Sequence, residues 1–258
     1  MKNVILEVAD QIATITISRP EALNALNNET TYELRDCLAD LEKRKDVRVI
    51  ILTGAGDKAF VAGADIAEML QESAAEGRDL SYLGIETFTK LENMPQVTIA
   101  AVNGFALGGG CELTLSCDLR IASERAVFGQ PETGLGIIPG FGGTQRLSRL
   151  IGKGRAKELI FTCRKVKAEE AYQIGLVNKV VPAEELMDEA YKMARRILKN
   201  SGFAIKMAKS VINTGLDMDL NSGLRLEADA IGLTFSTHDK VEGMTAFLEK
   251  RPANLTDF

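Results

Sequence analysis

The chain has 258 residues, of which 45% are hydrophobic and 26% are charged, and this balance is typical of a globular protein with a full core. Its net charge of -5 argues against a domain built to follow nucleic-acid phosphates, because that work needs clustered Lys and Arg. Four scattered cysteines and one histidine argue against a metal site, and no apolar run approaches the roughly 20 residues that span a bilayer.

The N-terminus and the cysteines bear on the cellular compartment. The opening residues MKNVILEV lack the basic flank and long apolar run of a secretory signal. No two cysteines form a CxxC pair, and structural disulfides belong to oxidising compartments. We therefore expect a cytoplasmic protein with free cysteines.

The chain begins with a unit of two strands followed by a helix. Two short strands are predicted within residues 4–18, on either side of a polar turn at Asp10 and Gln11. The sequence RPEALNAL then leads into a helix that Asn27 or Asn28 can cap. Apolar residues recur in this helix at the spacing of one inward face, at Leu34, Leu38 and Leu41.

Two nearly continuous apolar runs follow, VRVIIL at residues 47–52 and VTIAAV at residues 97–102. Such runs are typical of strands that are covered on both faces of a sheet. Shorter strand-like pieces occupy residues 119–122 and 126–128. The unit of two strands and a helix therefore recurs, although without a fixed sequence period.

The pattern changes towards the C-terminus. From residue 183 onward the apolar residues recur at helical spacing almost without a break. We predict an α/β domain over residues 1–200 and a helical region over residues 201–258.

One segment, NGFALGGGCEL at residues 103–113, has the features of a ligand site. The row of three glycines from Gly108 to Gly110 lets the backbone approach a ligand and leaves N–H groups free where a helix begins. Glu112 lies in the first turn of that helix, where a carboxylate is also a favourable structural choice. Rossmann and Walker glycine patterns are absent, so a nucleotide phosphate loop of those kinds is not expected.

Two further loops carry candidate groups. Glu132 stands in the Gly- and Pro-rich stretch FGQPETGLGIIPGFGG at residues 128–143, where a loop acid can be catalytic or merely solvated. In AFVAGADIAEM at residues 59–69, small residues would let the N–H of Ala64 point at a ligand oxygen. This last segment also fits an ordinary strand-to-helix connection with Asp65 as N-cap.

Taken together, the motifs resemble the crotonase family. The resemblance rests on RPEALNAL, AGADI, NGFALGGGCEL, PGFGGTQRL and the pair Glu112 and Glu132, which stand twenty positions apart. It runs essentially end to end, including EGMTAFLEKRP near the C-terminus. The family fold is a spiral of repeated ββα units with a C-terminal helical region that joins subunits. The resemblance thus implies an α/β crotonase-like spiral that forms trimers paired as a homohexamer.

The resemblance also implies a reaction. Enoyl-CoA hydratases of this family add water syn and reversibly to a trans-2-enoyl-CoA, through a thioester enolate, and give a 3-hydroxyacyl-CoA. The oxyanion hole would be the N–H groups of Ala64 and Gly109, Glu112 would activate water, Glu132 would protonate C2, and Gly140 would orient the water. Two carboxylates can divide these roles only if their environments separate their pKa values.

The ligand in this reading is an acyl-CoA thioester, so no further cofactor is expected and coenzyme A enters as part of the substrate. The resemblance places its CoA arm along eight residues: Ala22, Leu23, Lys58, Ala62, Asp65, Ile66, Phe247 and Lys250. Glu21 and Ala67 stand where relatives often carry basic residues, so a weaker or rearranged grip on the nucleotide is expected.

Other readings stay open. An enoyl-CoA isomerase could use the same enolate, although two glutamates favour hydration or 3-hydroxybutyryl-CoA dehydration. A non-catalytic or RNA-binding relative would be expected to carry a basic helix, whereas residues 35–48 mix acids and bases. The acyl length, guessed to be short, depends on residues 71–88 and Phe141. Direction, in β-oxidation of fatty acids or in butanoate metabolism, does not follow from the residues.

Overall fold

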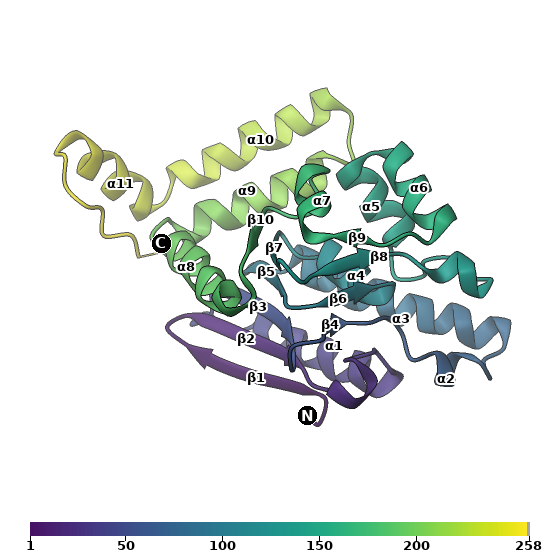
Figure 1. Cartoon of the computed structure of the whole chain (residues 1–258). Coiled ribbons are helices and arrows are strands. Elements are labelled where there is room, and N and C mark those ends of the chain that lie inside the picture. Colours follow the sequence, from purple (N-terminus) through teal and green to yellow (C-terminus); the bar gives the residue numbers. More distant parts are fainter. Residues whose placement is uncertain (257–258) are drawn as a thin grey trace.

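The computed structural model describes residues 1–256, arranged as Figure 1 shows. The first part contains β1 (Val4–Ala9), β2 (Ile12–Ile17), η1 (Pro20–Ala22), α1 (Asn28–Glu42), β3 (Val49–Gly54), β4 (Ala59–Val61), α2 (Ile66–Met69), α3 (Ala74–Asn93), β5 (Val97–Val102), β6 (Phe105–Leu107) and α4 (Gly109–Leu115). Next come β7 (Leu119–Ser123), β8 (Val127–Gly129), η2 (Glu132–Leu135), α5 (Gly143–Ile151), α6 (Lys153–Thr162), β9 (Val166–Lys167), α7 (Ala168–Gln173), β10 (Lys179–Val181), η3 (Ala183–Glu185) and α8 (Leu186–Leu198). The C-terminal helices are α9 (Gly202–Gly215), α10 (Leu220–Phe235) and α11 (His238–Leu248).

The strands form two sheets through which the chain winds in turns. One sheet has the order β1-β2-β3-β5-β7-β10 and the other the order β4-β6-β8-β9. Each of the pairs β3–β4, β5–β6 and β7–β8 gives its first strand to the larger sheet and its second to the smaller one. Strands from successive turns pair in parallel, as between β4, β6 and β8. The predicted spiral of ββα units is therefore confirmed.

The core explains the continuous apolar runs. In β3, Ile50 and Leu52 belong to the main apolar cluster, which includes side chains of the smaller sheet and of α1 and α3. Val49 and Ile51, on the opposite face, pack in a second cluster with residues of α8. Both faces of this strand are buried, so residues 49–52 are all apolar.

Helix starts follow side-chain capping. The side chain of Asn27 accepts a hydrogen bond from the Thr30 N–H, so Asn27, of the two predicted candidates, caps α1. Ser73 and Glu76 form a reciprocal capping box at the start of α3. This cap fixes where α3 begins, and α3 also contacts the turn at residues 140–141 through Ser81 and Phe88.

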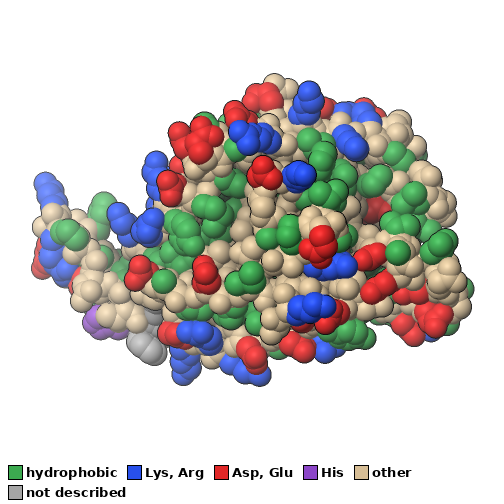
Figure 2. Space-filling model, turned by 60° about the horizontal axis from the view of Figure 1, so that its bottom comes forward, with side chains coloured by type: hydrophobic (Ala, Val, Ile, Leu, Met, Phe, Trp, Pro, Cys, Tyr) green, Lys and Arg blue, Asp and Glu red, His purple; other side chains and the backbone are tan. Residues whose placement is uncertain are grey.

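The C-terminal helices leave a broad apolar surface open. α9 has no buried residue, and α10 buries only Ala230. In Figure 1, α11 projects away from the body, and Figure 2 shows hydrophobic side chains gathered where this projecting region meets it. The exposed large apolar residues of α9 to α11 and their links are Ile212, Leu216, Met218, Leu220, Leu224, Ile231, Leu233, Phe235, Val241, Met244, Phe247 and Leu248. The division of the chain at residue 200 stays a prediction.

Among residues 1–256, no helix combines the length and the apolar character needed to cross a membrane. Nor do the His, Cys, Asp and Glu side chains of these residues gather in groups of three or more that could hold a metal ion.

A buried ion pair fastens α9 to the larger sheet. Lys209 Nζ contacts Asp118 Oδ2 and donates to the Gln96 carbonyl oxygen, both at 2.8 Å, and its side chain is 8% exposed. Asp118 Oδ2 also accepts from the N–H and hydroxyl of Thr98. The carboxylate is thus the point where the helical region and the sheet are joined.

Replacing Lys209 with methionine is expected to lower the free energy of unfolding by about 2 kcal/mol. The change removes the cation but leaves the partly buried Asp118 carboxylate, and breaking one side of such a pair is costly. Denaturant titration measures the loss. The control is Lys206→Met, because Lys206 is an exposed residue of the same helix. An equal loss in the two variants would contradict a specific role for Lys209.

Candidate active site

The glycine row brings α4 against the end of β4. A Cβ atom at Gly110 would overlap the carbonyl oxygen of Val61, the last residue of β4. Gly108 has φ +50°, and a Cβ there would lie 2.6 Å from Glu132 Oε1. Gly108 therefore permits both the left-handed turn and the approach of a carboxylate.

Two main-chain N–H groups meet at this junction. A Cβ built on Gly109 would lie 3.7 Å from the Ala64 nitrogen, so the loop after β4 and the start of α4 are neighbours. Gly109 is the first residue of α4, where N–H groups have no partner in the helix. None of the hydrogen bonds found within residues 1–256 uses the N–H of Ala64 or of Gly109. The two donors can serve a ligand oxygen.

Glu112 is buried next to these donors, with 1% of its surface exposed. Its Oε1 accepts from the N–H groups of Phe141 (2.8 Å) and Gly143 (2.6 Å). Burial raises the pKa of Glu112 to about 6, while the two N–H groups and the charge of Arg146 act to lower it. Oε2 accepts no hydrogen bond from the described residues, so it is the oxygen available for chemistry.

Glu132 begins η2 and is 9% exposed. Burial is the main cause that raises its pKa to about 7. Its own N–H opposes the shift, and the charge of Glu112 adds to it. The two predicted carboxylates are therefore brought together in one site, and the pKa of Glu132 is the higher.

Gln130 is a residue of this site that sequence reasoning missed. It is fully buried, and its side-chain amide faces Glu132. With the amide nitrogen turned towards the carboxylate, it donates to Oε1 and Oε2 of Glu132 at 3.1 Å each. The available signal was a polar residue next to the buried strand β8, because a buried amide requires a partner.

The turn at residues 139–143 closes the site on the side of α3. The Ser81 hydroxyl donates to the Gly140 carbonyl oxygen at 2.6 Å, and the Gly140 N–H takes part in no hydrogen bond among residues 1–256. The Phe141 ring packs edge-on against Phe88, with ring centroids 5.6 Å apart. A Cβ at Gly109 would lie 3.2 Å from the same ring. Phe141 therefore fills the space directly beside the two N–H donors.

Comparison with known proteins agrees with this geometry. The family model described as Enoyl-CoA hydratase/isomerase matches residues 7–257. The chain belongs to this family.

Named relatives lie within the same family. A short-chain-enoyl-CoA hydratase of Clostridium acetobutylicum is 54% identical over 97% of this chain and 96% of its own length. A crotonyl-CoA hydratase of Syntrophomonas wolfei is 53% identical over 98% of this chain and 97% of its own. The crystal structure of an enoyl-CoA hydratase from Bacillus anthracis superposes with a TM-score of 0.96 at 43% identity, and covers 99% of this chain and 100% of that one. The likeness extends over the whole crotonase fold.

The loop that carries Ala64 in this family member is held from two sides. Leu26 donates its N–H to the Gly63 carbonyl oxygen (2.8 Å) and accepts from the Asp65 N–H (2.9 Å). Asp65 Oδ2 pairs with Arg19 at 3.0 Å, while Oδ1 caps α2 through the Ala67 N–H. Both carboxylate oxygens of Asp65 are thus engaged within the protein, so this residue acts on the loop through its side chain.

The predicted CoA contacts fall into two groups. Leu23 and Lys58 line one hollow of about 170 Å³, and Ala22 and Ala62 lie beside it, since the Ala62 N–H donates to the Leu23 carbonyl oxygen. Ile66 is exposed at the start of α2.

Phe247 and Lys250 form the second group. Phe247 is 82% exposed on α11, and Lys250 follows two residues after that helix ends. Figure 1 shows α11 and α2 at opposite ends of the molecule. Within one chain, Phe247 and Lys250 therefore lie far from the CoA contacts predicted around α2.

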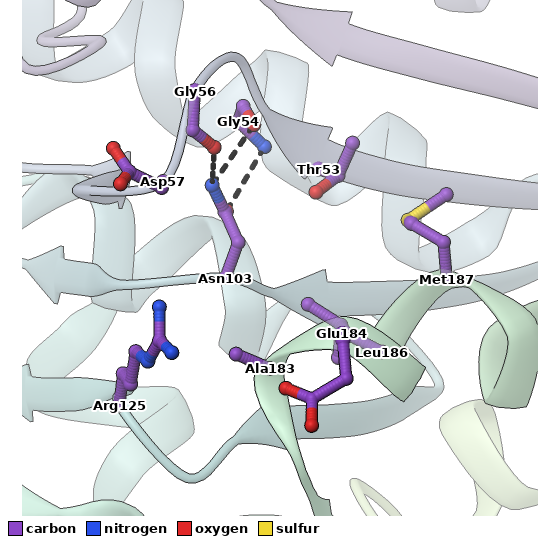
Figure 3. Close-up of a pocket in the computed structure, with 10 residues that line it drawn as sticks. All are labelled: Thr53, Gly54, Gly56, Asp57, Asn103, Arg125, Ala183, Glu184, Leu186 and Met187. Carbon is purple, nitrogen blue, oxygen red and sulfur yellow. Dashed lines mark hydrogen bonds between the residues drawn. The ribbon is translucent and has the colours of Figure 1, made fainter.

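A larger hollow lies apart from the carboxylates. It has a volume of about 390 Å³ and is bounded by the ends of β3 and β5, the turn after β7, and the start of α8. Figure 3 shows that Asn103 donates from its amide to the carbonyl oxygens of Gly54 and Gly56, which holds the turn after β3. The charged side chains of the hollow, Asp57, Arg125 and Glu184, are of both signs, and neither catalytic candidate lines it. We assign it no chemistry.

Proposed function

We propose that the chain is an enoyl-CoA hydratase, a hydro-lyase that adds water syn and reversibly to a short-chain trans-2-enoyl-CoA. The observation that carries the proposal is a pair of buried glutamates with raised pKa values beside two main-chain N–H groups that have no hydrogen-bond partner within residues 1–256. The names of the two relatives from Clostridium acetobutylicum and Syntrophomonas wolfei support the same reaction.

The N–H groups of Ala64 and Gly109 bind the thioester carbonyl oxygen. Negative charge grows on this oxygen when water attacks C3, and fixed donors stabilise the resulting enolate without reorganisation. The substrate brings its own coenzyme A, and no other cofactor takes part in the proposed step.

Glu112 acts as the base and Glu132 as the acid. The pKa of Glu112 is the lower, and its Oε1 is held by two N–H groups, so its ionised form is favoured and Oε2 can take a proton from water. The pKa of Glu132 is near 7, so a substantial fraction carries the proton that C2 requires. The Gly140 N–H, which has no protein partner among the described residues, orients the water. In dehydration the same groups act in reverse.

Crotonyl-CoA is the substrate that tests the proposal. Loss of its enoyl absorbance on mixing with the purified protein, with formation of 3-hydroxybutyryl-CoA by mass, is the expected result. Isomerisation of a 3-enoyl-CoA, with no hydration of any 2-enoyl-CoA, would instead establish an isomerase.

The rate of hydration is expected to follow a narrow bell in pH. Catalysis requires ionised Glu112 and protonated Glu132, so kcat/KM falls below about pH 6 as Glu112 takes up a proton and above about pH 7 as Glu132 loses one. Initial rates at low crotonyl-CoA concentration from pH 5 to pH 9 measure both limbs. A rate that stays level up to pH 9 would contradict the role of Glu132 as acid.

Phe141 is expected to limit the acyl chain. Its ring occupies the space beside Gly109, where the acyl group must lie if the thioester oxygen binds there. Replacement with alanine should raise kcat/KM for a C8 enoyl-CoA relative to crotonyl-CoA by about 10-fold or more, because a buried pocket of this kind gains about 1–3 kcal/mol from added methylenes. The measurement is kcat/KM for the two substrates in both proteins. An unchanged ratio would remove Phe141 as the limit.

We further propose a homohexamer of paired trimers, formed through the apolar surface of α9 to α11. A second copy would cover side chains that a monomer leaves in water. It could also bring its Phe247 and Lys250 to the nucleotide end of a bound CoA, which one chain does not do alone. Light scattering with size-exclusion chromatography tests the assembly. We place the protein in the cytoplasm, in fatty acid or butanoate metabolism, with metabolite levels setting the direction.

A further inference from the structure

An arginine outside the carboxylate pair holds the turn that binds Glu112. Arg146, in the first turn of α5, donates from Nη1 to the carbonyl oxygen of Phe141 at 3.0 Å. The Phe141 and Gly143 N–H groups on either side of this carbonyl donate to Glu112 Oε1. The same three residues of backbone therefore connect Arg146 to Glu112.

Gly142 makes this connection possible. Its φ is +108°, a conformation that side chains other than hydrogen rarely allow. A Cβ at this position would overlap Arg146 Nη1, so the guanidinium lies directly over the glycine. The turn is shaped to admit the arginine.

Helix α3 fixes the guanidinium. Arg146 donates from Nε (3.0 Å) and Nη2 (2.8 Å) to Glu92 Oε2, and from Nη2 to the Thr89 hydroxyl at 3.0 Å. Its side chain is 13% exposed, and that of Glu92 is 36% exposed. A planar guanidinium can reach all these acceptors at once, which a lysine cannot do.

We propose that Arg146, held by Glu92, is a positioning residue for Glu112, an inference that rests on the proposed hydration. It fixes the turn at residues 141–143 so that two N–H groups converge on Oε1 and leave Oε2 to the water. A displacement of about 1 Å at a reacting group can cost about 10²-fold in rate, so a fixed turn matters for catalysis.

The positive charge of Arg146 also favours the ionised form of Glu112, which is the form that can take a proton from water. The charged groups that bear on Glu112 are Arg146 of α5 and Glu132 of η2, with Glu92 of α3 paired to the arginine. Loss of the cation therefore favours the protonated form of Glu112. Loss of Glu92 leaves the cation without its counter-charge and favours the ionised form.

The experiment compares kcat, KM and the acid limb of the kcat/KM pH profile for crotonyl-CoA in wild type, Arg146→Gln, Arg146→Lys and Glu92→Gln. In Arg146→Gln, kcat should fall by about 10–100-fold with little change in KM, and the acid limb should move to higher pH. Arg146→Lys should restore the limb but not kcat. Glu92→Gln should lower kcat less than Arg146→Gln does and should move the acid limb to lower pH. Because this variant keeps Arg146, it still tests the proposal if Arg146→Gln does not fold.

The matched control is Arg149→Gln, because Arg149 lies on the same helix, is 63% exposed, and has its polar contacts within residues 1–256 with Gln145 and Asp217. It should behave as wild type. The inference is overturned if the acid limb stays in place in both Arg146→Gln and Glu92→Gln, or if Arg149→Gln shows the same losses. Absence of hydration in the wild type would instead reject the proposed function itself.

Discussion

Replacing Glu112 or Glu132 with glutamine is expected to lower kcat for hydration of crotonyl-CoA by about 10²–10⁴-fold, the usual scale of one acid or base group. Glutamine keeps the size of each side chain. At position 112 its amide oxygen can still accept from the Phe141 and Gly143 N–H groups, so the turn remains supported. The loss would then be one of proton transfer and not of structure.

Stability measurements distinguish a loss of proton transfer from a loss of structure. Burial raises the folded pKa of both glutamates, so each contributes stability below its unfolded pKa and loses it as pH rises through about 6 or 7. At pH 8 both are ionised, and a neutral glutamine removes the cost of burying a charge. The melting temperature of either variant at pH 8 should therefore equal or exceed that of the wild type.

The control for both is Glu124→Gln, because Glu124 is exposed in the turn after β7. It should leave kcat and melting temperature unchanged. Full activity in Glu112→Gln or in Glu132→Gln would falsify the two-carboxylate mechanism, whatever the stability data show.

Removing the Gly109 N–H is expected to cost at least about 10²–10³-fold in kcat, the measured scale for one oxyanion donor. Proline is the informative replacement, because Gly109 is the first residue of α4, a position where helices accept proline. The change deletes the donor and places the ring where the thioester oxygen would bind.

Gly109→Ala serves as its matched control. Alanine keeps the N–H, although its Cβ would lie 3.2 Å from the Phe141 ring and the ring must give way slightly. We expect a modest loss, within about 10-fold, since the donor is retained. Steady-state kcat values together with circular dichroism of both variants make the measurement. Equal losses in the two would show that space around Phe141, and not the N–H, is what Gly109 provides.

Much of this arrangement could be predicted from local pattern. The runs at residues 47–52 and 97–102 are apolar at nearly every position because both faces of β3 and β5 are covered, and that signal survives in a single sequence. Glu112 and Glu132 became candidates because they stand in Gly-rich segments, and the resemblance to the crotonase family named them as the catalytic pair.

Contacts between distant segments could not be predicted in this way. The role of Arg146 became visible only when the fold brought Glu92, 54 positions away, to its guanidinium and Glu112 to the neighbouring turn. Asp65 stays a predicted CoA contact, but the pairing of its carboxylate with Arg19, 46 positions away in the sequence, could not be foreseen. Neither periodicity nor turn chemistry carries information about such partners.

The winding of the chain through two sheets has a consequence for how the chemistry is distributed. Three successive turns supply the four groups shortly after their strands in the smaller sheet: Ala64 follows β4, Gly109 and Glu112 follow β6, and Glu132 follows β8. Because these strands pair in parallel, the groups that follow them emerge at the same edge of the smaller sheet. A substitution in one turn can thus alter the acid, the base or a donor while the other two turns keep their places, which gives this scaffold a route to new reactions one loop at a time.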